Sequence, residues 1–218
     1  MPFRVFWDLD GVQLDTDTLV AAVLSAASQS AGKTVGDARA AMEVANRQGF
    51  TWELFLKELG VPVPLWAELI GRFDRHFTTR ASEHVFEGVF DALYELGGAG
   101  AHQVLVTRGV PAFQQRKFDG MHTVVPFFDP GCRHFVPSGE SKGAVIARYG
   151  PVTMPAFFVD DSTEMLNDVR EAAPHVKLVR AAWAPSAPAE CPDDFVSWYP
   201  AFSPRQALAF ILEHGAAT

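Results

Sequence analysis

Short apolar runs that alternate with amphipathic stretches of helical length constrain the fold of this chain more than any other feature. Five such runs predict buried strands, at residues 3–7, 103–106, 124–128, 156–159 and 176–179. Helical patterns lie between the later runs, among them residues 88–96, 140–149 and 162–173. Strands separated by helices are typical of βαβ units, so we expect an α/β fold with a mostly parallel sheet.

A long helical block interrupts this alternation. Asp15 or Thr16 can cap a helix that runs to Ala31, and Gly49, Gly60 and Pro62 separate the helical patterns that follow. The sequence from residue 11 to residue 86 contains no strand-like run, which leaves an insert of about seventy residues. We expect residues 15–85 to form a helical cap, and residues 1–14 and 86–218 to form the α/β core.

Composition excludes several classes of protein. The 218 residues carry a net charge of −8 and no basic run, which argues against a nucleic-acid partner. No apolar stretch is long enough for a membrane span, and Asp8 and Asp10 interrupt the only apolar run near the start, so no signal-peptide pattern is present. Cys132 and Cys191 lie far apart, and neither they nor the seven histidines show metal-ligand spacing. We expect free thiols and a cytoplasmic location.

Two carboxylates follow the first predicted strand. Asp8 and Asp10 come one residue apart and are followed by Gly11. Alternation along an extended chain predicts that both side chains point to the same side. Like charges at that distance repel, so we expect either a bound divalent metal or a division of labour between a nucleophile and an acid.

Further polar side chains stand where other predicted strands end. They are Thr107, Asp160 and Asp161, and Lys142 opens the helix before the fourth predicted strand. Ligands of parallel sheets bind outside the carboxyl ends of the strands, so these groups are expected to converge on one rim with Asp8 and Asp10. Carboxylates, a hydroxyl and a lysine are the groups that phosphoryl transfer requires.

In these motifs the chain resembles the haloacid dehalogenase-like (HAD) hydrolase superfamily over nearly its whole length. The family's first motif, Asp-x-Asp-x-Thr/Val, is met by Asp8-Leu9-Asp10-Gly11-Val12. The second is met by Thr107, the third by Lys142 and the fourth by the pair Asp160-Asp161. The helical insert is similar to the family's C1 cap. The resemblance implies a Rossmann-like parallel sheet core with an inserted all-helical C1 cap.

The resemblance also implies roles for these residues. Asp8 would attack phosphorus and form an aspartyl-phosphate, while Asp10 would protonate the leaving oxygen and later deprotonate water. Mg²⁺ would bind Asp8, the backbone carbonyl of Asp10, and the pair Asp160 and Asp161. Thr107 and Lys142 would hold phosphoryl oxygens. Apart from the resemblance, Arg108 directly follows Thr107, so we expect it to contact either a second anionic group of the substrate or a surface carboxylate.

We therefore expect a Mg²⁺-dependent phosphatase of a small phosphorylated metabolite. A sugar-phosphate mutase and a non-catalytic regulatory or binding protein on the same fold stay open as alternatives. The presence of Asp10 argues against the family's dehalogenase and phosphonate-hydrolysing branches, which replace it. Specificity is expected from cap residues, with Arg39, Asn46, Arg47 and Gln48 as candidates and Arg47 as the first choice.

Overall fold

The alternation of strands and helices builds one parallel sheet. The structure is a computed structural model that describes residues 2–150, 154–183 and 198–216. Within these ranges the sheet has six strands, all pairing in parallel, in the order β3-β2-β1-β4-β5-β6. Their bounds are β1 Phe3–Trp7, β2 Ala101–Gly109, β3 Arg133–Pro137, β4 Ala156–Asp160, β5 Lys177–Ala181 and β6 Tyr199–Ala201. The predicted α/β class and Rossmann-like core are confirmed.

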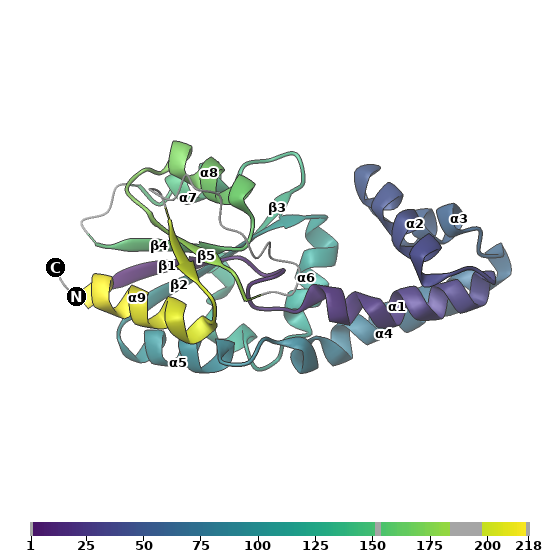
Figure 1. Ribbon diagram of the computed structural model, residues 1–218, viewed down its shortest axis with the longest axis horizontal. Helices are drawn as coiled ribbons and strands as arrows, with labels where there is room; N and C mark the ends of the chain where they lie inside the picture. Colours follow the sequence, from purple (N-terminus) through teal and green to yellow (C-terminus); the bar gives the residue numbers. More distant parts are fainter. Residues whose placement is uncertain (1, 151–153, 184–197, 217–218) are drawn as a thin grey trace.

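Helices cover both faces of the sheet (Figure 1). One face packs against α5 (Val89–Gly98) and α9 (Pro204–Ala216), and the other against α7 (Lys142–Ala147) and α8 (Thr163–Ala172). The central strand β1 explains why two layers of helices are needed. Val5 and Trp7 belong to the hydrophobic core on the α5–α9 face, and Phe6 belongs to the core on the α7–α8 face. A strand that is apolar on both faces is typical of a covered parallel sheet.

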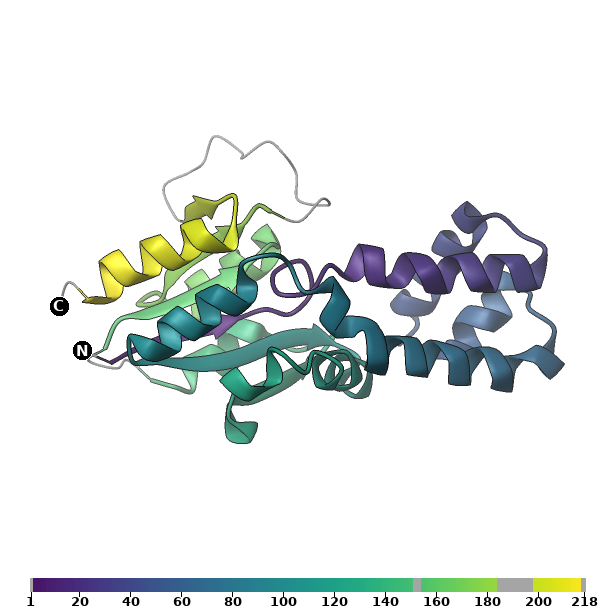
Figure 2. The same cartoon turned by 90° about the horizontal axis from the view of Figure 1, so that it is seen from below.

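The segment between β1 and β2 is helical. It contains α1 (Thr16–Ala31), α2 (Val35–Arg47), α3 (Trp52–Leu59) and α4 (Trp66–Arg80), with 3₁₀ turns η1 (Val63–Leu65) and η2 (Ala81–His84). Local signals set these ends: the side chain of Asp15 caps α1 by accepting a hydrogen bond from the backbone N–H of Thr18, and Gly32 and Gly60 end α1 and α3 in the left-handed conformation. The long helices α1 and α4 run side by side away from the sheet (Figure 2).

The chain enters and leaves this helical insert at one place. Leu14 and Val85 form an antiparallel bridge. Beside it, the N–H of Asp15 donates to the carbonyl of His84 at 2.8 Å, and the N–H of Phe86 donates to the carbonyl of Gln13 at 3.0 Å. The two segments that connect the core with the insert are therefore hydrogen-bonded to each other. The expected domain bounds at residues 15 and 85 stay predictions.

The insert also packs against α6 (Pro111–Asp119), the helix that follows β2. The ring of Phe113 on α6 lies 5.1 Å from Phe50, 5.5 Å from Trp52 and 5.0 Å from Phe77, measured between centroids. An ion pair of 2.7 Å between Arg116 and Asp74 joins α6 to α4. Helix α6 thus connects the insert to the core.

Two local predictions are wrong. Residues 124–128 do not form a strand: Val125–Phe127 is the 3₁₀ turn η3, in which Pro126 has no N–H for a sheet ladder. The strand at this edge is β3, Arg133–Pro137, which the sequence pattern missed because an edge strand is only partly buried. The helix expected at 140–149 is the shorter α7, and its N-cap is Ser141.

Three further observations complete the fold. Another 3₁₀ turn, η4 (Pro130–Cys132), precedes β3. Cys132 is a free thiol, as predicted, whereas Cys191 lies outside the described residues. Within the described ranges, no helix combines the length and apolar character needed to cross a membrane.

Candidate active site

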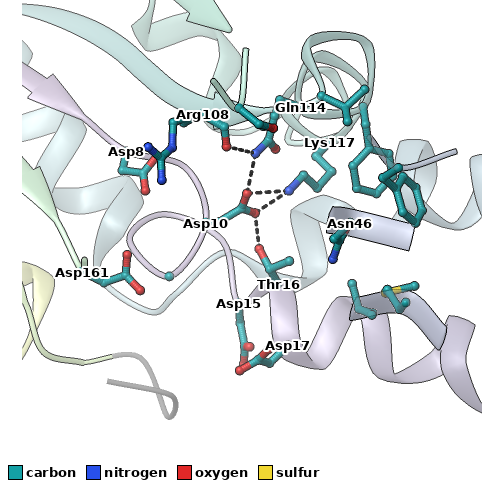
Figure 3. A pocket seen from close by; sticks show the side chains of 18 of the residues that line it. Asp8, Asp10, Asp15, Thr16, Asp17, Asn46, Arg108, Gln114, Lys117 and Asp161 are labelled. Carbon is teal, nitrogen blue, oxygen red and sulfur yellow. Dashed lines mark hydrogen bonds and ion pairs between the residues drawn. The ribbon is translucent and has the colours of Figure 1, made fainter. Parts of the chain in front are cut away.

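A pocket of about 450 Å³ lies between the carboxyl ends of the strands and the helical insert (Figure 3). Both parts of the chain line it. The core contributes charged and polar side chains, among them Asp8, Asp10, Arg108, Gln114, Lys117 and Asp161. The insert contributes polar residues at its start and mostly apolar residues further along, namely Asp15, Thr16, Asp17, Val20, Met42, Asn46 and Phe50.

Three carboxylates meet at the floor of the site. Asp8 directly follows β1, Asp160 is the last residue of β4, and Asp161 follows it. Oxygen atoms from the three lie within 4.8 Å of one another. Gly11, with φ +72°, is required beside them, because a Cβ at this position would collide with the carboxylate of Asp161. An oxygen-only set of this kind suits a hard divalent cation such as Mg²⁺.

The side chain of Lys142 provides a positive charge beside these carboxylates. Its Nζ atom lies 2.7 Å from Asp8 Oδ1 and 2.7 Å from Asp160 Oδ2, and its side chain is only 2 % exposed. Burial alone would lower the pKa of Lys142, but the charges of Asp160 and Asp8 outweigh burial and raise it. Lys142 is therefore charged at neutral pH.

One lysine does not balance three carboxylates. Burial raises the pKa of Asp8 to about 7, against the attraction of Lys142 and with added repulsion from Asp160 and Asp10. Burial and the charge of Asp8 raise the pKa of Asp161 to about 6, and burial also raises that of Asp160. A divalent cation among these oxygens would favour the ionised forms and offset the repulsion. The donor set therefore fits a magnesium ion.

The side chain of Asp10 points away from this cluster toward α6 (Figure 3). Lys117 Nζ lies 2.6 Å from each of its two carboxylate oxygens, and Gln114 Nε2 donates to Oδ2 at 2.8 Å. The hydroxyl of Thr16 donates to Oδ1. Strand alternation therefore failed to predict the direction of Asp10, because β1 ends at Trp7, before either carboxylate.

The donors around Asp10 determine its charge. Burial would raise the pKa of Asp10, but the charge of Lys117 and the hydrogen bonds from Lys117, Thr16 and Gln114 outweigh burial and lower it. Sequence reasoning missed Lys117, whose side chain is only 3 % exposed, and Gln114. The sequence offered one signal for them: Gln114 and Lys117 are three residues apart, which places both side chains on the same face of α6.

Arg108 lines the pocket near the end of β2, and Thr107 precedes it in that strand. Thr107 is buried, and its Oγ1 atom has no hydrogen-bond partner among the described residues. A buried hydroxyl without a partner is costly unless a ligand satisfies it, so this atom suits a phosphoryl oxygen. Arg108 forms a 3.0 Å ion pair with Glu164, whose side chain is 73 % exposed. Of the two expectations for Arg108, the structure contains the ion pair with a surface carboxylate.

Among the four candidate residues of the insert, Asn46 lines the pocket. Arg39, Arg47 and Gln48 are exposed and do not line it. The neighbours of Asn46 along the pocket wall are apolar, namely Val20, Met42 and Phe50. The insert therefore offers the pocket one amide and an apolar surface, in addition to the polar side chains of Asp15, Thr16 and Asp17 at its start.

Comparison with known proteins identifies the fold. No family model matches the chain, and no curated protein matches its sequence. Solved structures do match. A candidate haloacid dehalogenase-like hydrolase from Burkholderia xenovorans is 17% identical with a TM-score of 0.70, and the match covers 94% of this chain and 97% of that one.

Two further matches extend over nearly the whole chain. The candidate HAD hydrolase YfnB from Bacillus subtilis, solved with magnesium bound, is 17% identical with a TM-score of 0.61 and coverage of 96% and 98%. A candidate β-phosphoglucomutase from Thermotoga maritima is 18% identical with a TM-score of 0.64 and coverage of 97% and 99%. The chain therefore has the fold of the haloacid dehalogenase-like hydrolases.

Proposed function

We propose that this protein is a Mg²⁺-dependent phosphatase that hydrolyses a small phosphate monoester through an aspartyl-phosphate. One observation carries the proposal: Asp8, Asp160 and Asp161 converge with the buried Lys142 at the carboxyl ends of the strands. The fold, shared with HAD-like hydrolases, supports it.

The side chains divide the work of phosphoryl transfer. A carboxylate oxygen of Asp8 attacks phosphorus, and the bond from phosphorus to the ester oxygen breaks. The protonated form of Asp10 gives its proton to the departing oxygen, and the resulting carboxylate takes one from the water that attacks the aspartyl-phosphate, which restores the acid. Phosphate leaves and Asp8 is regenerated. Lys142, which contacts Asp8, and the buried hydroxyl of Thr107 hold phosphoryl oxygens throughout.

Asp8, Asp160, Asp161 and the backbone carbonyl of Asp10 would hold the Mg²⁺ ion. When bound, the ion offsets the negative charge of the carboxylates and of the phosphoryl group, which lets the anionic substrate approach an anionic nucleophile.

Asp10 needs a rearrangement before it can transfer a proton. Thr16, Gln114 and Lys117 make four hydrogen bonds to its carboxylate, which is about the number of acceptor sites that a carboxylate has. Thr16 is the first residue of α1, so movement of the insert would release one of these sites. We therefore expect substrate binding beneath the insert and proton transfer by Asp10 to be coupled.

A screen of phosphorylated metabolites with Mg²⁺ tests the proposal by following released phosphate. Activity should disappear in excess chelator and return when Mg²⁺ is added. Asp8→Asn should abolish turnover without unfolding the protein, whereas Glu164→Gln, at an exposed position on α8, should retain it. Phosphate release that survives excess chelator, or substantial turnover by Asp8→Asn, would refute the assignment.

A mutase is the second candidate, because the match to the candidate β-phosphoglucomutase from Thermotoga maritima covers 97% of this chain. A mutase would return the phosphoryl group to the substrate instead of to water. The same screen separates the two activities if isomeric sugar phosphates are analysed alongside free phosphate. The complete set of acidic residues argues against a purely regulatory protein.

A further inference from the structure

A second group of potential metal ligands lies at the opposite end of the sheet from the pocket. His102 is the second residue of β2, whereas Thr107 lies five residues further along the same strand, roughly 17 Å away. Asp129 precedes the 3₁₀ turn η4 and Cys132 is its last residue, and the turn leads into the neighbouring strand β3. The three ligand atoms, from an imidazole, a carboxylate and a thiol, lie within 4.8 Å of one another.

Local structure explains why the carboxylate and the thiol meet. Asp129 and Cys132 are three residues apart in a 3₁₀ turn, in which side chains at that spacing lie above one another. The N–H of Cys132 donates to the carbonyl of Asp129 at 2.8 Å and closes the turn. Because β2 and β3 are adjacent in the sheet, His102 reaches this turn from the side.

The spacing of the ligands is that of a metal site. Cys132 Sγ and His102 Nε2 are 3.5 Å apart. Two such ligands on one tetrahedral zinc ion, with bonds of about 2.3 Å to sulfur and about 2.0 Å to nitrogen, would be separated by about 3.5 Å. We propose that His102, Asp129 and Cys132 bind a zinc-like divalent cation, with solvent as the fourth ligand. This proposal is independent of the proposed phosphatase activity.

The ligand chemistry distinguishes this site from the catalytic one. A sulfur, a nitrogen and an oxygen suit Zn²⁺, whereas Mg²⁺ prefers oxygen alone. Cys132 is half-buried and Asp129 is exposed, so an ion can reach the site from solvent. Binding displaces the thiol proton of Cys132, and it requires the free electron pair of His102 Nε2.

Arg4 competes with the ion. Its Nε atom donates to His102 Nδ1 at 3.4 Å, which leaves the imidazole proton on Nε2, facing Cys132. To bind the ion, His102 must carry its proton on Nδ1 instead, and Arg4 must turn away from the ring. Arg4 already lies 4.7 Å above the ring of Tyr149, which can retain the guanidinium.

Cobalt titration tests the proposal, because Co²⁺ occupies zinc sites and absorbs strongly when a thiolate is bound. The titration is done with the full chain in excess Mg²⁺, which fills the oxygen-only acidic cluster. We expect one equivalent of Co²⁺ to produce the thiolate charge-transfer band, and Zn²⁺ to remove it. Cys132→Ser should abolish the band, whereas Cys191→Ser, the matched control, should retain it.

Three further variants complete the test. His102→Gln and Asp129→Asn should each weaken Co²⁺ binding at least tenfold, and Arg4→Met should tighten it severalfold because a competing positive charge is gone. A wild-type chain that shows no thiolate band at saturating Co²⁺ refutes the site, as does a band that survives Cys132→Ser. The proposed phosphatase reaction uses none of these residues. A failure to detect phosphate release would therefore leave the outcome of the cobalt titration unaffected.

Discussion

Asp10 and Lys117 show how one buried contact sets the state of a reactive side chain. Lys117 lowers the pKa of Asp10, and it does so from a helix that no motif marks. The motif residues Asp8, Thr107, Lys142 and Asp160 were predictable because each follows or precedes an apolar run. Lys117 was not, because its partner is distant in sequence and a lysine on an amphipathic helix is ordinarily solvated.

Asp10→Asn should impair turnover most for substrates with poor leaving groups. An alkoxide needs a proton as it departs, whereas an activated aryl oxide needs less help. General acid catalysis is typically worth about 10²–10⁴-fold, and we expect losses in this range for alkyl phosphates. The measurement is the rate of aspartyl-phosphate formation across a leaving-group series. Equal losses across the series would remove Asp10 from the role of acid.

Lys117→Met should raise the pKa of Asp10. Without the lysine charge, burial dominates and favours the protonated acid, so the basic limb of the kcat/KM profile for an alkyl phosphate should move to higher pH. An opposite charge at this distance typically shifts a carboxyl pKa by about 1–3 units. Lys117→Arg keeps the charge and should leave the limb nearly in place. A limb that stays in place in Lys117→Met would mean that the lysine only supports the packing of α6.

At the scale of elements, α6 contacts both the carboxylate of Asp10 and the helical insert. Gln114 and Lys117 contact Asp10, while Phe113 and Arg116 contact the insert. A displacement of the insert that carries α6 with it would therefore alter the donors around Asp10. The sequence did not predict these two partners of α6, because amphipathic periodicity marks a buried face without identifying what covers it.

Asn46→Ala should raise KM for the preferred substrate and change kcat less. Asn46 lies on the pocket wall formed by the insert, so we expect its amide to bind the substrate without touching the phosphoryl group. Loss of one neutral hydrogen bond costs about 1 kcal/mol, or roughly fivefold in KM. Steady-state kinetics with the preferred substrate and a small aryl phosphate measure this effect.

Arg47→Ala is the matched control, since Arg47 is the next residue of α2 and is absent from the pocket wall. It should leave KM within experimental error. A larger effect from Arg47→Ala than from Asn46→Ala would show that the insert presents a different face to the substrate during turnover.

At the scale of the whole molecule, unfavourable charge at the site should make stability depend on pH. Asp8 and Asp161 have pKa values of about 7 and about 6 in the folded chain, above the value near 4 of an unfolded aspartate. The folded protein therefore binds protons more readily than the unfolded chain between pH 4 and pH 7. The contribution of these groups to the free energy of unfolding is fully present below pH 4 and is lost as the pH rises to about 7.

Mg²⁺ should reverse this trend, because the ion competes with the same protons. We expect the increase in the urea midpoint caused by Mg²⁺, relative to chelator, to be larger at pH 8 than at pH 5. In chelator, the urea midpoint of Asp161→Asn should depend less on pH than that of the wild type. An equal effect of Mg²⁺ at both pH values would contradict the link between metal and carboxylate protons.

The sequence predicts the architecture better than it predicts contacts between distant residues. Runs such as Phe3–Trp7 are apolar on both faces, so local composition reveals a buried central strand. Edge strand β3 carries Arg133 and His134 and was missed because only one of its five residues is fully buried. The grouping of His102 with Cys132 was equally invisible, because the sheet alone brings these positions together.

The two connecting segments are paired at Leu14 and Val85, and this pairing affects how such a chain can diversify. Because the insert leaves and rejoins the core at neighbouring hydrogen-bonded positions, its two ends are related like those of a hairpin. Replacing everything between them by a short turn would break no ladder of the six-stranded sheet and would not change the strand order. The helical segment is therefore an exchangeable module, and a lineage can trade one such segment for another of different length while the acidic rim beneath it keeps its place.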